Sequence, residues 1–106
     1  MIEYIYLSWD KNKLFGYEKI KSFDRIAQYV EYLKKGDEFP AVSVKKIKDN
    51  IYSLIWVGEN GDGLGGHKRA IAHYIANKSL KCVLVGKGLV VPETDKISIK
   101  DITLEI

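Results

Sequence analysis

The feature that most constrains the fold is a pair of short segments that are apolar on both faces. They span residues 51–57 and 80–85, and a glycine-rich loop and a short helical pattern over 67–77 separate them. A strand that is apolar on both faces is covered on both sides, so both segments are expected inside a sheet. Strand, helix and strand in this order favour a crossover unit, although so short a helix leaves the pairing of the strands open.

The first part of the chain predicts a strand, a loop and an amphipathic helix. β-Branched and aromatic residues fill positions 2–7, and a polar loop is expected to follow through Gly16. Apolar residues at three-and-four spacing predict a helix over 23–35. Ser22 is expected to be its N-cap, and Gly36 its left-handed C-terminal cap.

Further strands complete a predicted α+β fold. A strand over 41–48 is expected to turn at Asp49-Asn50 into the segment 51–57, and a brief strand covers 89–91. The alternation of apolar residues near the C-terminus changes phase at Lys100-Asp101, which indicates a bulge or a break. We expect one compact domain over residues 1–106, with a small mixed sheet and two main helices.

Charge, cysteine content and the lengths of apolar runs limit which kinds of protein this chain can be. The 106 residues carry 17 Lys and Arg against 14 Asp and Glu, a net charge of +3 that solvated lysines explain without nucleic acid. The lone Cys82 excludes an internal disulfide framework and a multi-cysteine zinc site. The start shows no signal-peptide pattern and no apolar run approaches a membrane span, so a cytoplasmic protein is expected. Abundant Ile, Lys, Tyr and Glu beside a single Gln, Met and Cys is typical of thermophiles.

The glycine-rich loop carries the strongest functional signal. Five of the nine glycines fall within residues 58–66, directly before the short helix. Glycine lets the backbone approach a ligand, and the first amides of a helix attract anions. Lys68 and Arg69 stand where the helix dipole disfavours cations by roughly 0.3–1 kcal/mol each, which makes sense if an anion binds there. Alternatively, the loop is a flexible surface segment whose two cations are solvated or paired with Glu59 and Asp62.

These segments resemble the ParB/sulfiredoxin-like superfamily. The resemblance covers residues 40–86 and rests on Pro40-Ala-Val, on Leu64-Gly-Gly-His-Lys-Arg-Ala-Ile-Ala72 and on Leu80-Lys-Cys-Val-Leu-Val85. ParB-like nucleases and ADP-dependent free serine kinases carry Asp-Gly-His-X-Arg, which Gly66, His67 and Arg69 match. Sulfiredoxins carry Gly-Gly-Cys-His-Arg, matched here by two glycines and the arginine.

The resemblance implies a ParB/sulfiredoxin-like fold that binds nucleotide phosphates. Arg69 would clamp two phosphate oxygens, and Gly65, Gly66 and the amides of His67 and Lys68 would form the cradle. The implied cofactors are ATP or another nucleotide, and Mg²⁺.

Two acidic or basic side chains could add chemistry to this loop. Asp62 is the candidate metal ligand and a candidate catalytic residue, because Mg²⁺ is bound by one or two carboxylates. His67 is equally able to act as an acid or base and to be inert.

The departures from the family pattern matter as much. His67 stands where sulfiredoxins have their catalytic cysteine, so reduction of a sulfinic acid is nearly excluded. The acid that nucleases and kinases place before the motif is replaced by Gly65, and Asp62 is the nearest substitute. A partition protein would also need a DNA-reading helix-turn-helix, which the chain leaves no room for.

The leading hypothesis is a nucleotide-binding protein, of the phosphotransferase or nucleotide-hydrolase kind if it has activity. The alternative is a DNA-associated ParB-like nuclease or accessory module of a partition system or mobile element. A third is a degenerate domain whose loop only contacts a partner protein. His73, Glu18 and Asp24 are explained by a half-exposed helix edge, a loop and a first helical turn, so they are weak site candidates.

Overall fold

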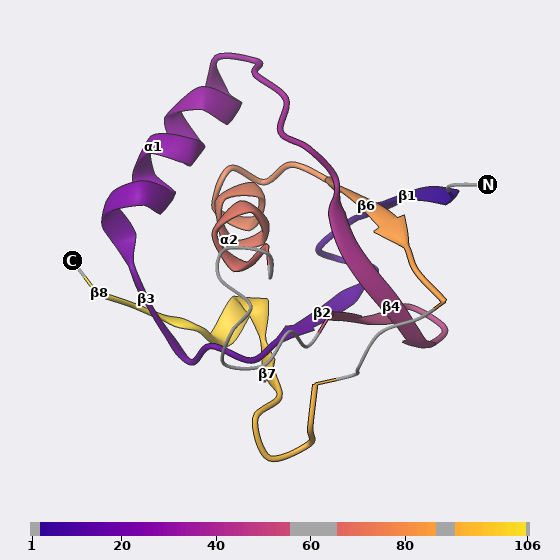
Figure 1. Ribbon diagram of the computed structural model, residues 1–106. Helices are drawn as coiled ribbons and strands as arrows, with labels where there is room; N and C mark the ends of the chain where they lie inside the picture. The colour runs from indigo at the N-terminus through magenta and orange to yellow at the C-terminus, as the bar shows by residue number, and fades with distance from the viewer. Residues whose placement is uncertain (1–2, 56–65, 87–90, 106) are drawn as a thin grey trace.

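The computed structural model describes residues 3–55, 66–86 and 91–105, which fold into two sheets and two helices (Figure 1). Eight of the eleven elements in the described residues are strands and two are α-helices, which fits the predicted α+β class. In chain order the elements are β1 (Glu3–Leu7), β2 (Lys13–Gly16), β3 (Ile20–Ser22), α1 (Phe23–Lys34), β4 (Val42–Lys48), β5 (Ile51–Leu54), α2 (His67–Ile75), β6 (Leu80–Leu84), β7 (Ile97–Ser98), the 3₁₀ turn η1 (Ile99–Asp101) and β8 (Thr103–Glu105).

The larger sheet is mixed and has the order β1-β6-β4-β5-β2-β7. Strands β5 and β6 both have neighbours on each side, which confirms the prediction from their apolar faces. The turn at Asn50, whose φ is 66°, places β5 antiparallel beside β4. On its other side, β4 pairs with β6 in parallel. The two strands that flank the glycine loop are therefore not paired with each other, and the crossover returns the chain to β4.

One strand of this sheet was predicted to be loop. Residues 13–16 form β2, which lies parallel to β5 and antiparallel to β7. Leu14 and Phe15 are the only large apolar residues of this short stretch, too few to show alternation in the sequence. Leu14 is nevertheless buried in the core, so long-range pairing and burial decide its conformation.

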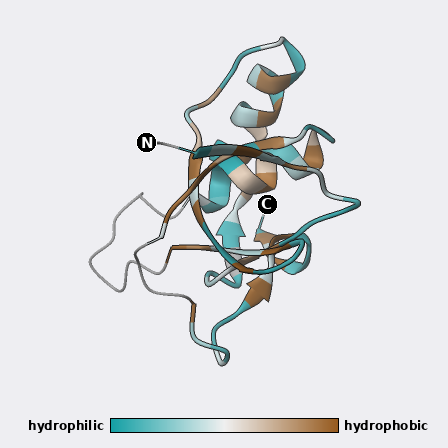
Figure 2. Ribbon diagram, turned by 90° about the vertical axis from the view of Figure 1, so that its right-hand side faces the viewer, coloured by the Kyte–Doolittle hydropathy of each residue, from teal (hydrophilic) through white to brown (hydrophobic). Residues whose placement is uncertain are grey.

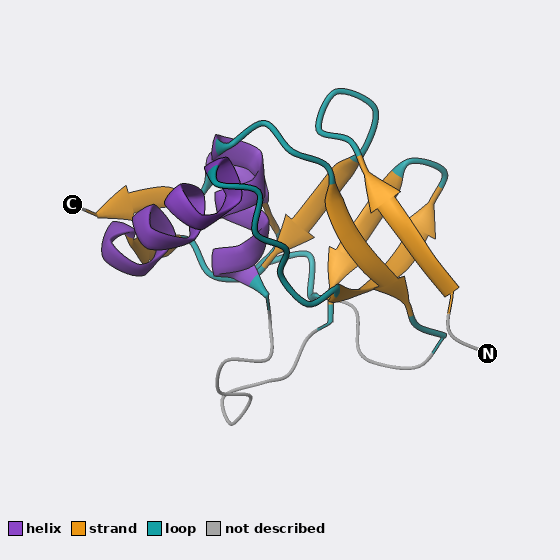
Figure 3. Ribbon diagram, turned by 90° about the horizontal axis from the view of Figure 1, so that it is seen from above, coloured by secondary structure: helices purple, strands orange, loops and turns teal. Residues whose placement is uncertain are grey.

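Both helices lie on one side of the larger sheet, as the view from above shows (Figure 3). Helix α1 follows Ser22 as predicted, although the serine side chain makes no capping hydrogen bond. Gly36 has φ +95° and its amide donates to the carbonyl of Leu33 at 3.1 Å, so the predicted left-handed cap is confirmed. The two helices pack against each other and against the sheet, which encloses the core.

The C-terminal part closes the fold. The predicted break in alternation is confirmed, because η1 separates β7 from β8. Strand β8 pairs in parallel with β3, the strand that leads into α1, and so forms the second, two-stranded sheet. Apolar residues recur along the strands and helices (Figure 2). No helix among the described residues is long and apolar enough to cross a membrane.

Candidate functional site

The N-terminal end of α2 is built around a glycine. Gly66 adopts φ +80° and ψ 10° immediately before the helix, a left-handed conformation that side chains rarely take. A Cβ atom at this position would lie 2.5 Å from Cγ1 of Val42, on β4. The carbonyl of Gly66 accepts the first helical hydrogen bond, from the amide of Ala70 at 3.0 Å. Both the backbone conformation and the packing therefore require glycine here, whether or not a ligand binds.

The amides that precede this first bond belong to His67, Lys68 and Arg69. They have no acceptor within the helix and lie at the positive end of its dipole. The first turn of α2 contains no acidic residue. The Lys68 side chain is half-buried in this turn and adds a full positive charge. Amides, dipole and ammonium group together make this end of α2 a place that favours an anion.

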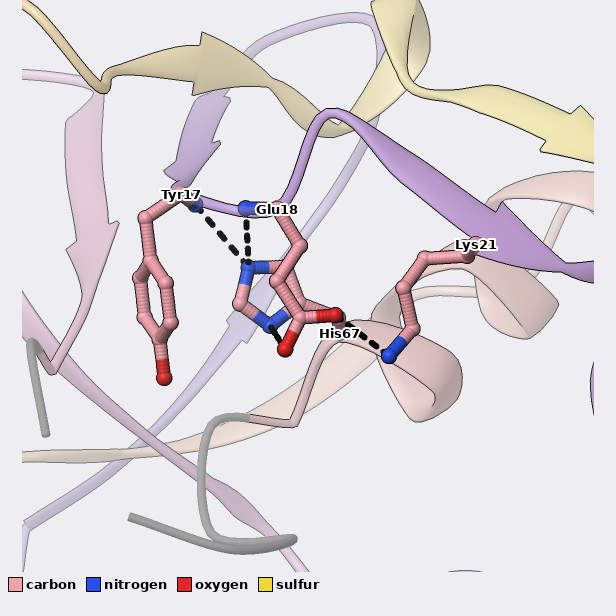
Figure 4. Close-up of polar contacts among 4 residues, drawn as sticks. All are labelled: Tyr17, Glu18, Lys21 and His67. Carbon is pink, nitrogen blue, oxygen red and sulfur yellow. Dashed lines mark hydrogen bonds and ion pairs between the residues drawn. The ribbon is translucent and has the colours of Figure 1, made fainter. Parts of the chain in front are cut away.

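The His67 side chain points into the protein, where 4% of its surface is exposed. Its Nε2 atom accepts hydrogen bonds from the backbone amides of Tyr17 at 2.9 Å and Glu18 at 3.3 Å (Figure 4). Because both partners are donors, Nε2 carries a lone pair and the ring proton sits on Nδ1. A Cβ atom on Gly16 would lie 2.6 Å from Nε2, so a glycine makes room for the ring. His67 thereby fastens the segment after β2 to the start of α2.

An ion pair lies on the other side of the His67 ring. The Glu18 Oε1 atom is 3.9 Å from Nδ1, and the other carboxylate oxygen of Glu18 pairs with Lys21. The Tyr17 ring meets the imidazole edge-on with 4.4 Å between the ring centres. Figure 4 shows the three side chains around His67: Tyr17 and Glu18 come from the segment that follows β2, and Lys21 comes from β3.

Burial controls the protonation of His67. It lowers the pKa of the imidazole from 6.5 to about 4, against the attraction of the Glu18 carboxylate and with a smaller contribution from Lys21. His67 is therefore neutral at pH 7, with its lone pair already engaged. Of the two predicted roles, this geometry favours the structural one, and the catalytic one stays a prediction.

Arg69 is anchored by the backbone that leads into β4. Its Nη1 atom donates to the carbonyls of Pro40 at 3.0 Å and Ala41 at 3.2 Å. A phosphate clamp would have to use the remaining guanidinium hydrogens. The guanidinium thereby joins the segment just before β4 to the first turn of α2.

Other candidate residues lie elsewhere or outside the described part. Asp62, Gly65 and Glu59 lie outside the described residues, so the predicted metal ligand and one predicted cradle glycine have no geometry here. Among residues 3–55, 66–86 and 91–105, no three His, Cys, Asp or Glu side chains come together to hold a metal. Cys82 is fully buried, and burial raises the pKa of its thiol to about 12, which fits the predicted inert role.

Sequence reasoning missed Gly16, Tyr17 and Lys21 as neighbours of the motif, and it gave Glu18 little weight. Their partner His67 is about fifty positions away in the sequence, so no local spacing connects them. Comparison with protein-family models, curated proteins and solved structures finds no match to this chain.

Proposed function

We propose that this chain binds the phosphate groups of a nucleotide at the N-terminal end of α2. The observation that carries the proposal is the composition of the first helical turn, where amides with no acceptor in the helix lie beside Lys68 and Arg69 and no acid is present. Two cations at this end oppose the helix dipole, and a bound phosphate would relieve that repulsion. The likeness of Gly66, His67 and Arg69 to the Gly-His-X-Arg motif adds independent support.

Under this proposal, Lys68, Arg69 and His67 have different roles in binding phosphate. Lys68 would contribute charge, and the amides of His67 and Lys68 would donate hydrogen bonds to phosphate oxygens. Arg69 has a double role, because its contacts with the Pro40 and Ala41 carbonyls also hold the loop before β4 in place. His67 keeps the helix start fixed through the amides of Tyr17 and Glu18.

If the protein also transfers or hydrolyses phosphate, Glu18 is the described carboxylate next to this end of the helix. It lies beside the His67 ring and is paired with Lys21. A carboxylate in such a place can accept a proton from an attacking hydroxyl or bind Mg²⁺ through water. The DNA-associated alternative stays a prediction, since none of the described contacts favours it over nucleotide binding.

Thermal unfolding with ATP, ADP, CTP and GTP, each with Mg²⁺, tests the proposal. A ligand at a hundred times its Kd adds about 2.7 kcal/mol, which raises the Tm of a domain this size by on the order of 10 °C. Lys68→Gln is expected to abolish most of the rise without lowering the Tm of the free protein. Lys46→Gln, at an exposed ion pair on the β4–β5 hairpin, is the matched control and should leave the rise intact.

Arg69→Ala is expected to lower the Tm even without nucleotide, because two backbone carbonyls lose their partner. It is therefore informative only beside Lys68→Gln. No rise with any of the four nucleotides at millimolar concentration would overturn the proposal, as would an equal rise in the wild type and Lys68→Gln.

A further inference from the structure

A second candidate site lies at the other end of α2. A pocket of about 260 Å³ opens between the end of α1, the segment 36–39, the turn after α2 and strands β1 and β6. It shares no lining residue with the first turn of α2, so it stands apart from the proposed phosphate site. Its volume lies below the roughly 300–1,000 Å³ of pockets that hold drug-sized ligands. The pocket therefore suits a small metabolite better than a drug-sized ligand.

Two apolar side chains and one histidine form part of the pocket lining. Leu33 and Phe39 line it together with His73, which is 8% exposed and meets the Phe39 ring edge-on at 6.0 Å. The His73 Nδ1 atom is 2.6 Å from the carbonyl oxygen of Arg69. A carbonyl only accepts, so Nδ1 carries the proton and Nε2 carries a lone pair.

That lone pair is open to a ligand. Nε2 has no hydrogen-bond partner among the described residues, yet none of their buried side-chain nitrogens and oxygens is left without one. Nε2 is therefore accessible, on a side chain that lines the pocket. Burial lowers the pKa of His73, so the ring is an acceptor for a donor group at neutral pH.

The charged residues of the pocket come in two sets. Asp37 and Glu38 follow α1, whereas Lys78 and Lys81 follow α2, and the four formal charges cancel. No ion pair joins the acids to the lysines within the described part of the chain.

Each lysine instead has another partner: Lys78 reaches across to α1, and Lys81 contacts β1. The Lys78 ammonium donates to the carbonyl of Leu33 at 2.6 Å. The Lys81 ammonium lies over the Tyr4 ring, 4.7 Å from its centre. Neither Asp37 nor Glu38 forms an ion pair with another described residue. Opposite charges thus border one small pocket without neutralising each other.

We propose that this pocket binds a small zwitterion, a molecule with one ammonium and one carboxylate group. Its ammonium would meet Asp37 and Glu38 and donate to His73 Nε2, and its carboxylate would meet Lys81 and the hydroxyl of Ser79. Its carbon chain would lie against Leu33 and Phe39. A ligand with both charges satisfies both sets, whereas a singly charged one leaves one set unpaired.

A series of ω-amino acids provides the test, from glycine through 4-aminobutanoate to 6-aminohexanoate. Amide chemical shifts of the full chain are followed by NMR as each compound is added, with butylamine and butanoate as singly charged controls. We expect saturable shifts at residues 36–39 and 78–81 for at least one zwitterion. The controls are expected to bind at least fivefold more weakly.

Charge-neutral variants sharpen the result. The double variant Asp37→Asn/Glu38→Gln and the single variant Lys81→Gln are both expected to weaken binding at least fivefold. All three residues are exposed, so these variants should fold. The double variant Lys46→Gln/Asp49→Asn removes an exposed ion pair outside the pocket and should bind as the wild type does.

Three outcomes would overturn this proposal: no shift at 50 mM of any zwitterion, equal binding by butylamine or butanoate, or unchanged binding in both pocket variants. None of them depends on nucleotide binding, because the probes contain no phosphate. The two proposals can therefore fail separately.

Discussion

Two histidines six positions apart on α2, His67 and His73, differ in the hydrogen-bond partners of their Nε2 atoms. His67 and His73 are both buried, and burial is the largest cause of the lowered pKa of each. At His67, two backbone amides occupy Nε2 and the Glu18 carboxylate lies near Nδ1. At His73, a carbonyl occupies Nδ1 and Nε2 is left accessible. Burial and a lowered pKa therefore do not distinguish a structural histidine from one that can bind a ligand. The hydrogen-bond partners of Nε2 do distinguish them.

The same contrast extends to the two ends of α2. At its start, packing is tight: a methyl group on Gly16 would collide with His67, and one on Gly66 would collide with Val42. At its end, His73 borders a pocket. Substitutions should therefore change stability most at the start of the helix and ligand binding most at its end.

The largest effect is expected from Gly66→Ala. The new Cβ would meet Val42 Cγ1 at 2.5 Å on a backbone with φ +80°. Strain of about 1–2 kcal/mol and overpacking of about 1–3 kcal/mol add to a loss of roughly 2–5 kcal/mol in the free energy of unfolding. Gly36→Ala is the matched control, since its φ is +95° but nothing lies within 4 Å of the added atom. Urea unfolding should show the smaller loss there, and equal losses would contradict the packing argument.

His67→Ala should come next. Its removal leaves the amides of Tyr17 and Glu18 without their acceptor, which costs about 1–3 kcal/mol for each amide that stays buried. His73→Ala removes one side-chain contact from a single backbone carbonyl, that of Arg69, and we expect a loss of about 1 kcal/mol. Chemical denaturation of both variants compares them directly. A larger loss in His73→Ala would reverse the assignment of anchor and binding group.

Acid should weaken the protein through His67. Its folded-state pKa of about 4 lies below the unfolded value of 6.5, so the unfolded chain binds more protons between these values. The stabilisation is fully present above pH 6.5 and is lost as the pH falls toward 4, up to about 3 kcal/mol. Unfolding measured from pH 7.5 to 4 should show this slope, and His67→Gln should flatten it. An unchanged slope in His67→Gln would assign the acid sensitivity to other groups, His73 among them.

A smaller effect than that of acid is expected from the coupling between Gly16 and His67. Gly16→Ala places a Cβ 2.6 Å from Nε2 and should destabilise the wild type, but much less so in a His67→Ala background. The double-mutant cycle should give a coupling of roughly 1–2 kcal/mol in the unfolding free energy. Additive losses would mean that the ring moves aside without cost.

Local patterns were sufficient to predict most elements but not their partners. The spacing of apolar residues located α1, and glycine chemistry located the cap at Gly36. The strand β2 was missed because two apolar residues cannot show a period. The contact between His67 and the Tyr17 amide depends on two segments that only the tertiary fold brings together. The predicted roles of Asp62 and Gly65 lie outside the described residues and stay predictions.

The pairing of β3 with β8 constrains when the smaller sheet can form during folding. Residues 20–22 find their partner strand only at 103–105, so this sheet cannot form until most of the chain has been synthesised. At about 5–20 residues per second, a ribosome needs on the order of 10 s to make the intervening segment. Helix α1 can form early from local contacts. The backbone groups of β3, the strand that precedes α1, stay unpaired with β8 until the C-terminal residues have been made. Pairing β3 with the C-terminal strand β8 closes this long loop and is expected to be among the last steps of folding.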